Sequence, residues 1–225
     1  PTTCTRMVLE ARLAMYNFGL HVAPFESDAV EGFRLREPAN FEAARRACGF
    51  VGRSGYAGTP GVRSWGPQVF PRFIEGSGFD SAPSSLSLWA DIESLMAFSY
   101  DGVHADALKH ARNWNVKPSW PPLVLWWVGP HHRPDWAEAV ERFEHLADNG
   151  PSARAFTFKI PFGPDGAAVE IDPDNPGVRQ QLADAYLKLG MLDEARAQVD
   201  QAIFLHPTHE RDYRIHLEEL KGMTE

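Results

Sequence analysis

The stretch that decides the fold is residues 84–130, which read SSLSLWADIESLMAFSYDGVHADALKHARNWNVKPSWPPLVLWWVGP. Its first part, 86–89, alternates as a half-buried strand does, and its last part, 122–128, is the continuous apolar run of a covered strand. Between them, Asp91 can cap a helix, and Asp101-Gly102 interrupts the helical pattern before a second helix begins. The stretch therefore predicts a strand, a short helix, a longer helix and a second strand.

The second helix of this stretch carries the candidate chemistry. The side chains that share one of its faces are those of His104, Leu108, Ala111 and Arg112. Trp114 follows just past its end, so an imidazole, a guanidinium and an indole lie along an apolar stripe. Such a face could line a pocket. It could equally pack on a sheet with its polar groups satisfied.

The chain before this stretch predicts two strands and an interrupted helix. Residues 9–22 form the opening strand, 27–47 the helical segment and 50–56 the second strand. Pro38 interrupts the helical segment, and Asn40 is then a suitable cap for its second part.

The chain after this stretch adds one helix and one strand. Asp135 caps a helix over 136–147, and 155–160 is a short fifth strand. The order of elements becomes β, α, β, β, α, β, α, β, which contains a split βαβ unit. This order predicts an α+β fold.

The long connection at residues 57–83 is rich in glycine and proline but also carries Trp65 and three phenylalanines. A disordered linker would be poor in aromatic residues. Two interpretations remain open: a binding loop or lid over a ligand, and an insertion that covers an edge strand.

The composition limits the classes of function. Hydrophobic residues make up 44% of the 225, with 7 Trp and 14 Phe, which favours aromatic-lined packing or a ligand pocket. A net charge of −8 argues against nucleic acid or an anionic membrane as the main partner. Two cysteines, Cys4 and Cys48, form no disulfide framework, and we find no cleavable signal or membrane-spanning apolar run. We therefore expect a cytoplasmic protein.

Residues 161–174 are rich in proline, glycine and aspartate, and the chain beyond them has a helical pattern. Such a change marks a domain boundary. We expect a first domain over 1–162 and a helical tail over 163–225.

Several short sequence patterns follow one another in a fixed order along the first domain. They are Ser87-x-Trp89 with Glu93, Leu95, Phe98 and Tyr100; His104 with Arg112 and Trp114; the run 123–128; and His132-x-Pro134 through Glu138, Arg142 and Leu146 to the segment 155–158. In this order and spacing they resemble, over about residues 9–160, a bacterial family known as the domain of unknown function numbered 3291. The resemblance implies a ferredoxin-like half-barrel that pairs with a second copy, and thus a homodimeric α/β barrel. It implies no established activity.

The segment at about 173–207 resembles a single tetratricopeptide repeat. The residues at the spacings of that repeat are Leu182, Ala183, Tyr186, Gly190, Ala195, Val199, Ala202 and Pro207. Arg179 departs from the usual early tryptophan. One repeat cannot bury its own apolar face. The resemblance therefore implies a helical hairpin that packs on the first domain or on another chain, as a structural appendage or a site for a protein partner.

His104 is the residue on which an enzymatic interpretation depends. The wider superfamily of dimeric α/β barrels includes haem-binding oxygenases, quinone-forming monooxygenases without a cofactor, and small cyclases. Some haem members resemble this chain in placing basic and aromatic residues after a helix histidine. This implies His104 as the haem ligand, with Arg112 and Trp114 also binding haem. A neutral imidazole can equally act as an acid or base without a metal, or be an ordinary core histidine.

Further residues are candidates to line a substrate cavity: Tyr16, His21, Trp65, Trp89, Tyr100 and Trp126. Aromatic residues on strands are more often simply core. His131 and His132 are adjacent in a turn and have no third ligand at metal spacing, which disfavours a metal site. The sequence lacks the nucleotide-binding, zincin and hydrolase motifs.

These observations predict an enzyme that acts on a small hydrophobic substrate, with a haem-dependent oxygenase of specialised metabolism favoured. One alternative is a cofactor-independent cyclase, isomerase or monooxygenase that uses the same cavity. The other is a non-catalytic binding or scaffold protein that recruits a protein partner through its helical tail.

Overall fold

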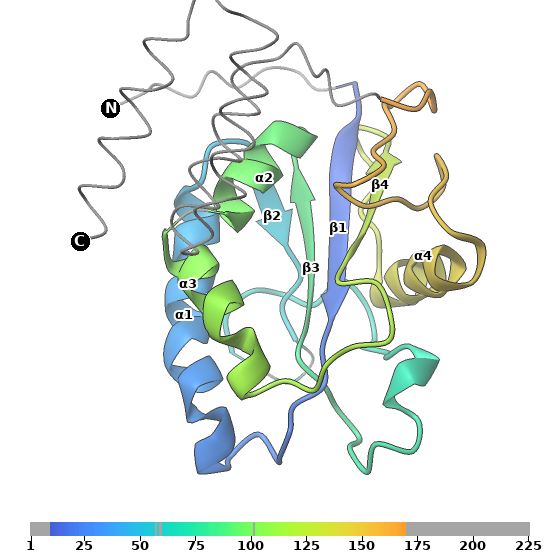
Figure 1. Cartoon of the computed structure of the whole chain (residues 1–225). Helices are drawn as coiled ribbons and strands as arrows, with labels where there is room; N and C mark the ends of the chain where they lie inside the picture. The colour runs from blue at the N-terminus through green and yellow to red at the C-terminus, as the bar shows by residue number, and fades with distance from the viewer. Residues whose placement is uncertain (1–9, 57, 59, 101, 170–225) are drawn as a thin grey trace, which may run out of the picture.

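The computed structural model describes residues 10–56, 58, 60–100 and 102–169, and these form a four-stranded antiparallel sheet flanked by helices. The strands are β1 Arg12–Phe18, β2 Phe50–Arg53, β3 Ser84–Trp89 and β4 Val124–Val128. Their order in the sheet is β2-β3-β1-β4 (Figure 1). This confirms the expected mixed α/β architecture and the position of each of these four strands.

The central strand β1 fixes the two faces of the sheet. Its residue Met15 is paired with Ser87 of β3 and with Leu125 of β4. Because side chains alternate along a strand, Leu13 and Met15 point to one face, whereas Ala14 and Tyr16 point to the other.

One face carries the helices α1 Glu31–Arg46, α2 Ile92–Ser99 and α3 Gly102–His110 (Figure 1). We call this the helix face. α3 is followed by a 3-10 turn, Ala111–Asn113. The core under these helices is a small cluster of apolar side chains: Leu13, Met15, Ala44, Trp89, Leu95, Leu125 and Phe156.

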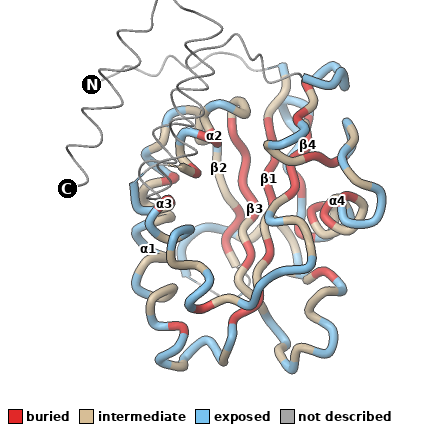
Figure 2. The backbone as a smooth tube through the Cα atoms, viewed as in Figure 1, coloured by how far each residue is buried: buried red, intermediate tan, exposed pale blue. Residues whose placement is uncertain are grey.

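The opposite face, which we call the α4 face, is covered by α4 Trp136–Asn149. Ala139, Phe143 and Leu146 point inward from α4, as the sequence predicts. Buried residues run along the strands and the inner side of α4 (Figure 2). This face holds the larger core cluster of the described chain.

Both predicted helix caps are confirmed. The carboxylate of Asp91 accepts a hydrogen bond from the backbone N–H of Ser94 at 2.7 Å, and that of Asp135 accepts one from Glu138 at 2.8 Å. Each cap satisfies a donor that the first turn of a helix leaves unpaired.

The expected break at Pro38 is wrong, because α1 runs through it without interruption. Asn40 lies inside the helix and caps nothing. Pro38 is on the exposed side of α1, where water can bind the carbonyl that proline leaves unpaired. Ala44 packs on the sheet and Arg36 is bound to Asp106 of α3, so both halves of the helix are held by neighbours.

The fifth strand expected at 155–160 is not a regular strand. Phe156 makes an isolated bridge with Leu125, with N–O distances of 2.8 and 2.9 Å, and the other bridges in this segment are local. Its apolar side chains still pack as expected, since Phe156 is fully buried on the helix face.

Among the described helices, none is both long and apolar enough to cross a membrane. The predicted helical hairpin at 173–207 lies outside the described residues. Cys48 is not a free cysteine, so the structure gives no support to the cytoplasmic location inferred from cysteine usage.

Candidate functional site

A cavity of about 730 Å³ lies on the helix face, between the sheet and helices α1 and α3. Its walls are mostly apolar, and a cavity of this size and character is typical of small-molecule sites. The aromatic side chains that line it are Phe18, Phe33, Phe41, Phe50, Tyr56, Trp89, Phe98, Trp114 and Trp120.

The sequence of β3 explains why the sheet leaves room for this cavity. In the run SSLSLW, Leu86 and Leu88 are buried in the cluster on the α4 face, whereas Ser85 and Ser87 line the cavity. Small side chains at these two positions leave a space under the helices that leucines would fill. The alternation of β3 therefore gives one packed face and one hollow face.

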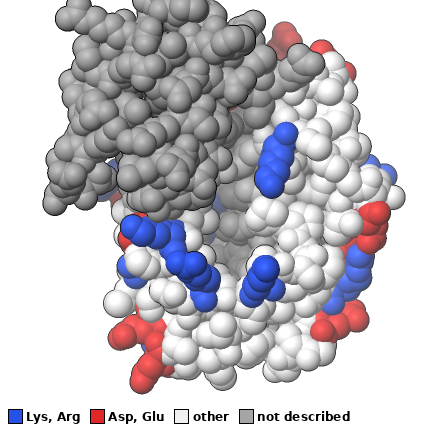
Figure 3. All heavy atoms as spheres, viewed as in Figure 1, with Lys and Arg blue, Asp and Glu red and all other residues white. Residues whose placement is uncertain are grey.

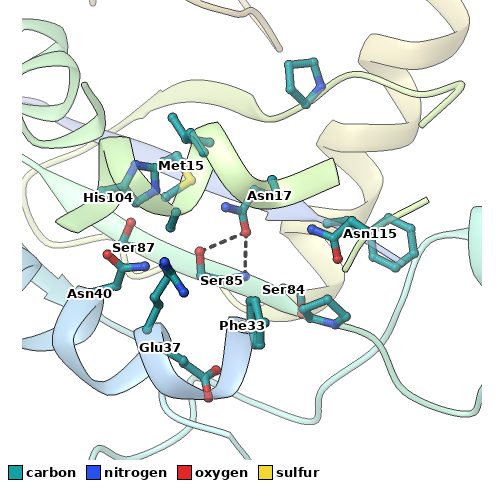
Figure 4. Close-up of a pocket in the computed structure, with 18 of the residues that line it drawn as sticks. Met15, Asn17, Phe33, Glu37, Asn40, Ser84, Ser85, Ser87, His104 and Asn115 are labelled. Carbon is teal, nitrogen blue, oxygen red and sulfur yellow. Dashed lines mark hydrogen bonds between the residues drawn. The ribbon is translucent and has the colours of Figure 1, made fainter. Parts of the chain in front are cut away.

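His104 of α3 lines the cavity together with Met15 and Ser87 (Figure 4). Its Nδ1 lies 2.7 Å from the carbonyl oxygen of Ser99, so Nδ1–H donates to that carbonyl and Nε2 carries no proton in the neutral ring. Nε2 has no hydrogen-bond partner among the described residues. Burial lowers the pKa of His104, and the bond to Ser99 offsets this only partly. The imidazole is therefore neutral near pH 7.

Polar side chains form the floor of the cavity, and we call Asn17, Ser85, Ser87 and Asn40 the polar floor. Oδ1 of Asn17 accepts hydrogen bonds from both the backbone N–H and the hydroxyl of Ser85, at 2.9 Å each (Figure 4). Oδ1 of Asn40 is buried and accepts no hydrogen bond. The polar floor thus combines fixed and unpaired groups.

Cationic side chains border the hollow where the cavity opens (Figure 3). Arg36 is held by Asp106 at 2.7 Å and lies 5.4 Å over the ring of Trp114. Arg112 and Lys117 are exposed, and no described residue forms an ion pair with either of them. These two cations can bind a carboxylate.

Glu37 and Arg53 lie at another part of the cavity wall. Burial raises the pKa of the Glu37 carboxyl, and Arg53 counteracts this in part. Arg53 lies 3.7 Å over the ring of Phe41. Sequence reasoning missed Glu37 and Asn40, which sit three positions apart on α1, because it broke this helix at Pro38.

Four of the residues predicted for the site line the cavity: His104, Arg112, Trp114 and Trp89. The other candidates do not. Tyr16 and Trp126 are buried on the α4 face, and Trp65 packs against the same cluster.

His21 and Tyr100 do not line the cavity either. Nδ1 of His21 is 2.9 Å from Oδ1 of Asn115, which does line the cavity, and burial lowers the pKa of His21. The ring of Tyr100 is 6.0 Å from that of Phe158.

The loop at 57–83 is not a lid over this cavity. Only Pro83 among its described residues lines the cavity, whereas Trp65, Phe70 and Phe73 pack on the α4 face. The aromatic residues that suggested a binding loop are partly buried against the core cluster of the α4 face. The loop therefore covers a face of the sheet, which is nearer to the alternative interpretation of a covering insertion.

Among the described residues, the two adjacent histidines are not part of a cluster that could hold a metal ion. Nε2 of His132 lies 2.6 Å from Oε2 of Glu138, and His131 is exposed. The described part of the chain contains no group of three or more His, Cys, Asp or Glu side chains that could hold a metal ion.

Comparison with known proteins gives two matches, both to families. Residues 166–215 match the tetratricopeptide repeat, and residues 12–172 match a domain of unknown function, DUF3291. No curated protein and no solved structure matches the chain. The DUF3291 match spans the sheet, the four α-helices of the described residues and every residue that lines the cavity, and it covers well over half of the chain. The chain therefore belongs to the DUF3291 family.

Proposed function

We propose that this protein is an enzyme that binds a small, mostly hydrophobic molecule in the cavity on the helix face, and that His104 accepts a proton from it. The observation that carries the proposal is the state of His104: a neutral imidazole with Nδ1 held by Ser99 and Nε2 unpaired at an apolar cavity. A base with a pKa near or below neutrality is ready to act at physiological pH.

The surroundings of His104 suit proton abstraction. The carbonyl of Ser99 orients the ring and stabilises the imidazolium that forms when Nε2 takes a proton. Aromatic walls exclude water, which strengthens charge interactions inside the cavity. Arg112 and Lys117 bind an acidic group of the substrate at the mouth. Cofactor-independent oxygenation, cyclisation and isomerisation all can begin with such a step.

A fluorescent anionic probe, 8-anilinonaphthalene-1-sulfonate, tests occupancy of the cavity in the full chain. Ala107 lines the cavity from α3, so Ala107→Phe should fill space and weaken binding of the probe. Ala147→Phe, the same change at an exposed position of α4, is the matched control and should bind as the wild type does. Equal binding by both variants would place the probe elsewhere and count against the proposal. Circular dichroism checks that both variants fold.

A haem-dependent oxygenase is a second candidate, favoured by the hydrogen bond from His104 to Ser99. Histidines that bind metal usually donate their other N–H to a carbonyl or carboxylate, as Nδ1 does here at 2.7 Å. The apolar cavity and the exposed Arg112 and Lys117 suit a flat macrocycle with carboxylates. His104 would be the iron ligand, and haem when bound would supply redox and oxygen chemistry.

Hemin titration into the full chain separates these two candidates. A Soret band that is lost in His104→Ala but kept in His131→Ala, a change at an exposed histidine, supports haem. A colourless protein that takes up no hemin removes haem and leaves the proton-abstraction proposal standing.

A non-catalytic scaffold is favoured by the tetratricopeptide match at 166–215. Repeats of this type present helical surfaces to protein partners. If a pull-down partner is lost when residues 173–225 are deleted, and kept in His104→Ala, the tail recruits that partner.

The resemblance to dimeric α/β barrels implies a homodimer in which two ferredoxin-like sheets pack face to face. In this chain α4 and the loop at 57–83 cover the α4 face, so a second copy would contact α4 rather than bare strands. Light scattering of the purified chain measures the oligomeric state, and substitutions on the outer side of α4 test that surface.

A further inference from the structure

The ring of Phe98 lies in the wall of the cavity beside His104. The centroids of these two rings are 4.9 Å apart. The Phe98 ring also stacks on Trp89, with centroids 5.1 Å apart and an interplanar angle of 27°, and Trp89 in turn meets Phe50 edge-on at 5.2 Å. All four residues line the cavity. Aromatic contacts therefore fix the position of the Phe98 ring next to the imidazole.

A second hollow, of about 570 Å³, lies between helices α1, α2 and α3 (Figure 1). Among the described residues, Phe98 is the only one that lines both the cavity and this second hollow. The other apolar side chains around the second hollow are small, and they are Ala43, Ala47, Ala97 and Val103. The Phe98 ring therefore separates the two spaces.

The cationic mouth of the cavity lies at the other end of α3 from His104. Arg112, in the 3-10 turn that follows α3, lines the cavity together with Lys117, and both side chains are exposed. Positions 104 and 112 are eight residues apart, which corresponds to about 12 Å along a helix. An acidic group bound at the mouth thus leaves the rest of an elongated ligand to extend along the cavity toward His104.

We propose that Phe98 limits the length of the ligand, which is an elongated apolar carboxylate. Its carboxylate binds Arg112 and Lys117 at the mouth, and the far end of its body stops against the Phe98 ring beside His104. An extended chain advances about 1.2 Å per bond, so about ten carbon atoms span this distance. The inference rests on the proposed function and deepens it, because it says which end of the ligand meets the imidazole.

Saturated fatty acids from hexanoate to hexadecanoate test this limit on the full chain. Isothermal titration calorimetry measures each affinity below the critical micelle concentration. Each methylene that is buried against apolar walls should strengthen binding about fourfold. We expect the affinity to rise in this way up to about ten carbons and then to level off or fall, because further methylenes meet the Phe98 ring.

Phe98→Ala should move the limit to longer chains, because the second hollow then becomes continuous with the cavity. Tetradecanoate should bind this variant about tenfold more tightly than it binds the wild type, or better, whereas octanoate should bind both similarly. Phe33→Ala is the matched control, since Phe33 lines the cavity but not the second hollow. It should weaken all the fatty acids alike and leave the limit unchanged. Circular dichroism checks that both variants fold.

Ala43→Phe fills the second hollow from α1 and gives an independent test. Alone it should leave the wild-type limit unchanged, and combined with Phe98→Ala it should restore that limit. If Phe98→Ala fails to fold, Phe98→Leu retains an apolar side chain without the ring. It should move the limit in the same direction by a smaller amount.

The outcomes separate this inference from the proposed function. Affinities that keep rising through hexadecanoate in the wild type would overturn the length limit and leave the cavity as a binding site. A limit that stays in place in a folded Phe98→Ala or Phe98→Leu variant would also overturn it, as would binding of anilinonaphthalene sulfonate without binding of any fatty acid. If neither the fatty acids nor anilinonaphthalene sulfonate bind, the proposed function fails and this inference fails with it.

Discussion

The two faces of the sheet are built from the same strands but differ in how they are filled. On the α4 face, Tyr16, Trp136 and Phe143 are fully buried, and the ring of Tyr16 meets the other two edge-on at 6.2 and 5.4 Å. On the helix face, serine and asparagine side chains line a cavity of about 730 Å³. The α4 face therefore holds the fold together, and the helix face is free to bind a ligand.

This division follows from the period of two along a strand. In β3 the leucines at 86 and 88 point to the α4 face, and the serines at 85 and 87 point to the cavity. A single strand can thus contribute to a tight core and to a polar binding floor. The comparison predicts that the same kind of substitution costs more stability on the α4 face than on the helix face.

The largest expected effect is that of Phe143→Ala on the α4 face. Phe143 is 0% exposed and lies among Tyr16, Phe18 and Phe73, so removing its ring leaves a cavity and should cost about 3–5 kcal/mol of unfolding free energy. Phe98→Ala on the helix face should cost about half as much or less, since Phe98 is only partly buried and already borders open space.

Urea unfolding of the full chain measures both values. Equal losses for the two variants would show that the helix face is packed as tightly as the α4 face, and would contradict the comparison.

Asp91→Ala and Asp135→Ala should have smaller effects. Each substitution should cost about 1 kcal/mol of unfolding free energy, because it removes the acceptor of a first-turn N–H. The two should differ in their effect on binding. Asp91 caps α2, which ends at Ser99, the residue that orients His104. Asp91→Ala should therefore weaken binding of 8-anilinonaphthalene-1-sulfonate, whereas Asp135→Ala, on α4, should leave it unchanged at equal loss of stability.

The sequence predicts a structural element well when the pattern that determines it lies within a few neighbouring residues. The alternation of β3, the apolar run of β4 and the two aspartate caps are local patterns, and all are confirmed. The break at Pro38 is wrong because packing of α1 against the sheet and α3 outweighs a local preference. The strand expected at 155–160 makes only one bridge to a strand of the sheet, between Phe156 and Leu125 of β4, and its other bridges are local.

The residues of the candidate site could likewise be predicted only where they lie close together in the sequence. His104, Arg112 and Trp114 lie close in the sequence, so helical spacing was enough to bring them to one cavity. Tyr16 and Trp126 were grouped with them because alternation assigns side chains to faces but does not say which face is hollow. The polar floor joins Asn17, Asn40 and Ser87 from three elements, and only the three-dimensional structure brings these together.

Titration of His104 on the helix face should account for part of the pH dependence of the free energy of unfolding. Burial lowers its pKa below the ordinary 6.5, so in acid the unfolded chain binds a proton that the folded chain does not. Stability should therefore fall as the pH drops through 6.5, until the lower folded-state pKa is reached. His21, with its pKa also lowered by burial, acts in the same direction, and Glu37, with a raised pKa, acts in the opposite one.

Urea midpoints between about pH 7.5 and 5.5, a range centred near the ordinary histidine pKa, measure this effect. His104→Gln should flatten the curve, while His131→Gln, at an exposed position, should leave it unchanged. A curve that keeps its slope in His104→Gln would assign the dependence to His21 and to other groups.

The smallest expected effect is on the α4 face, at the ion pairs that join the loop at 57–83 to α4. Arg72 pairs with Asp148 and, at 3.6 Å, with Glu144; Arg72 and Asp148 are exposed and Glu144 is only partly buried, so water and salt screen their attraction. Phe73, next in the chain, instead packs its ring against Phe143 and Trp120. Arg72→Gln should shift the urea midpoint far less than Phe73→Ala, and raising the salt to about 1 M should remove the shift altogether. If Arg72→Gln proved the more damaging of the two, charge rather than aromatic burial would hold the loop, and the α4 face would not be the packed structural side described above.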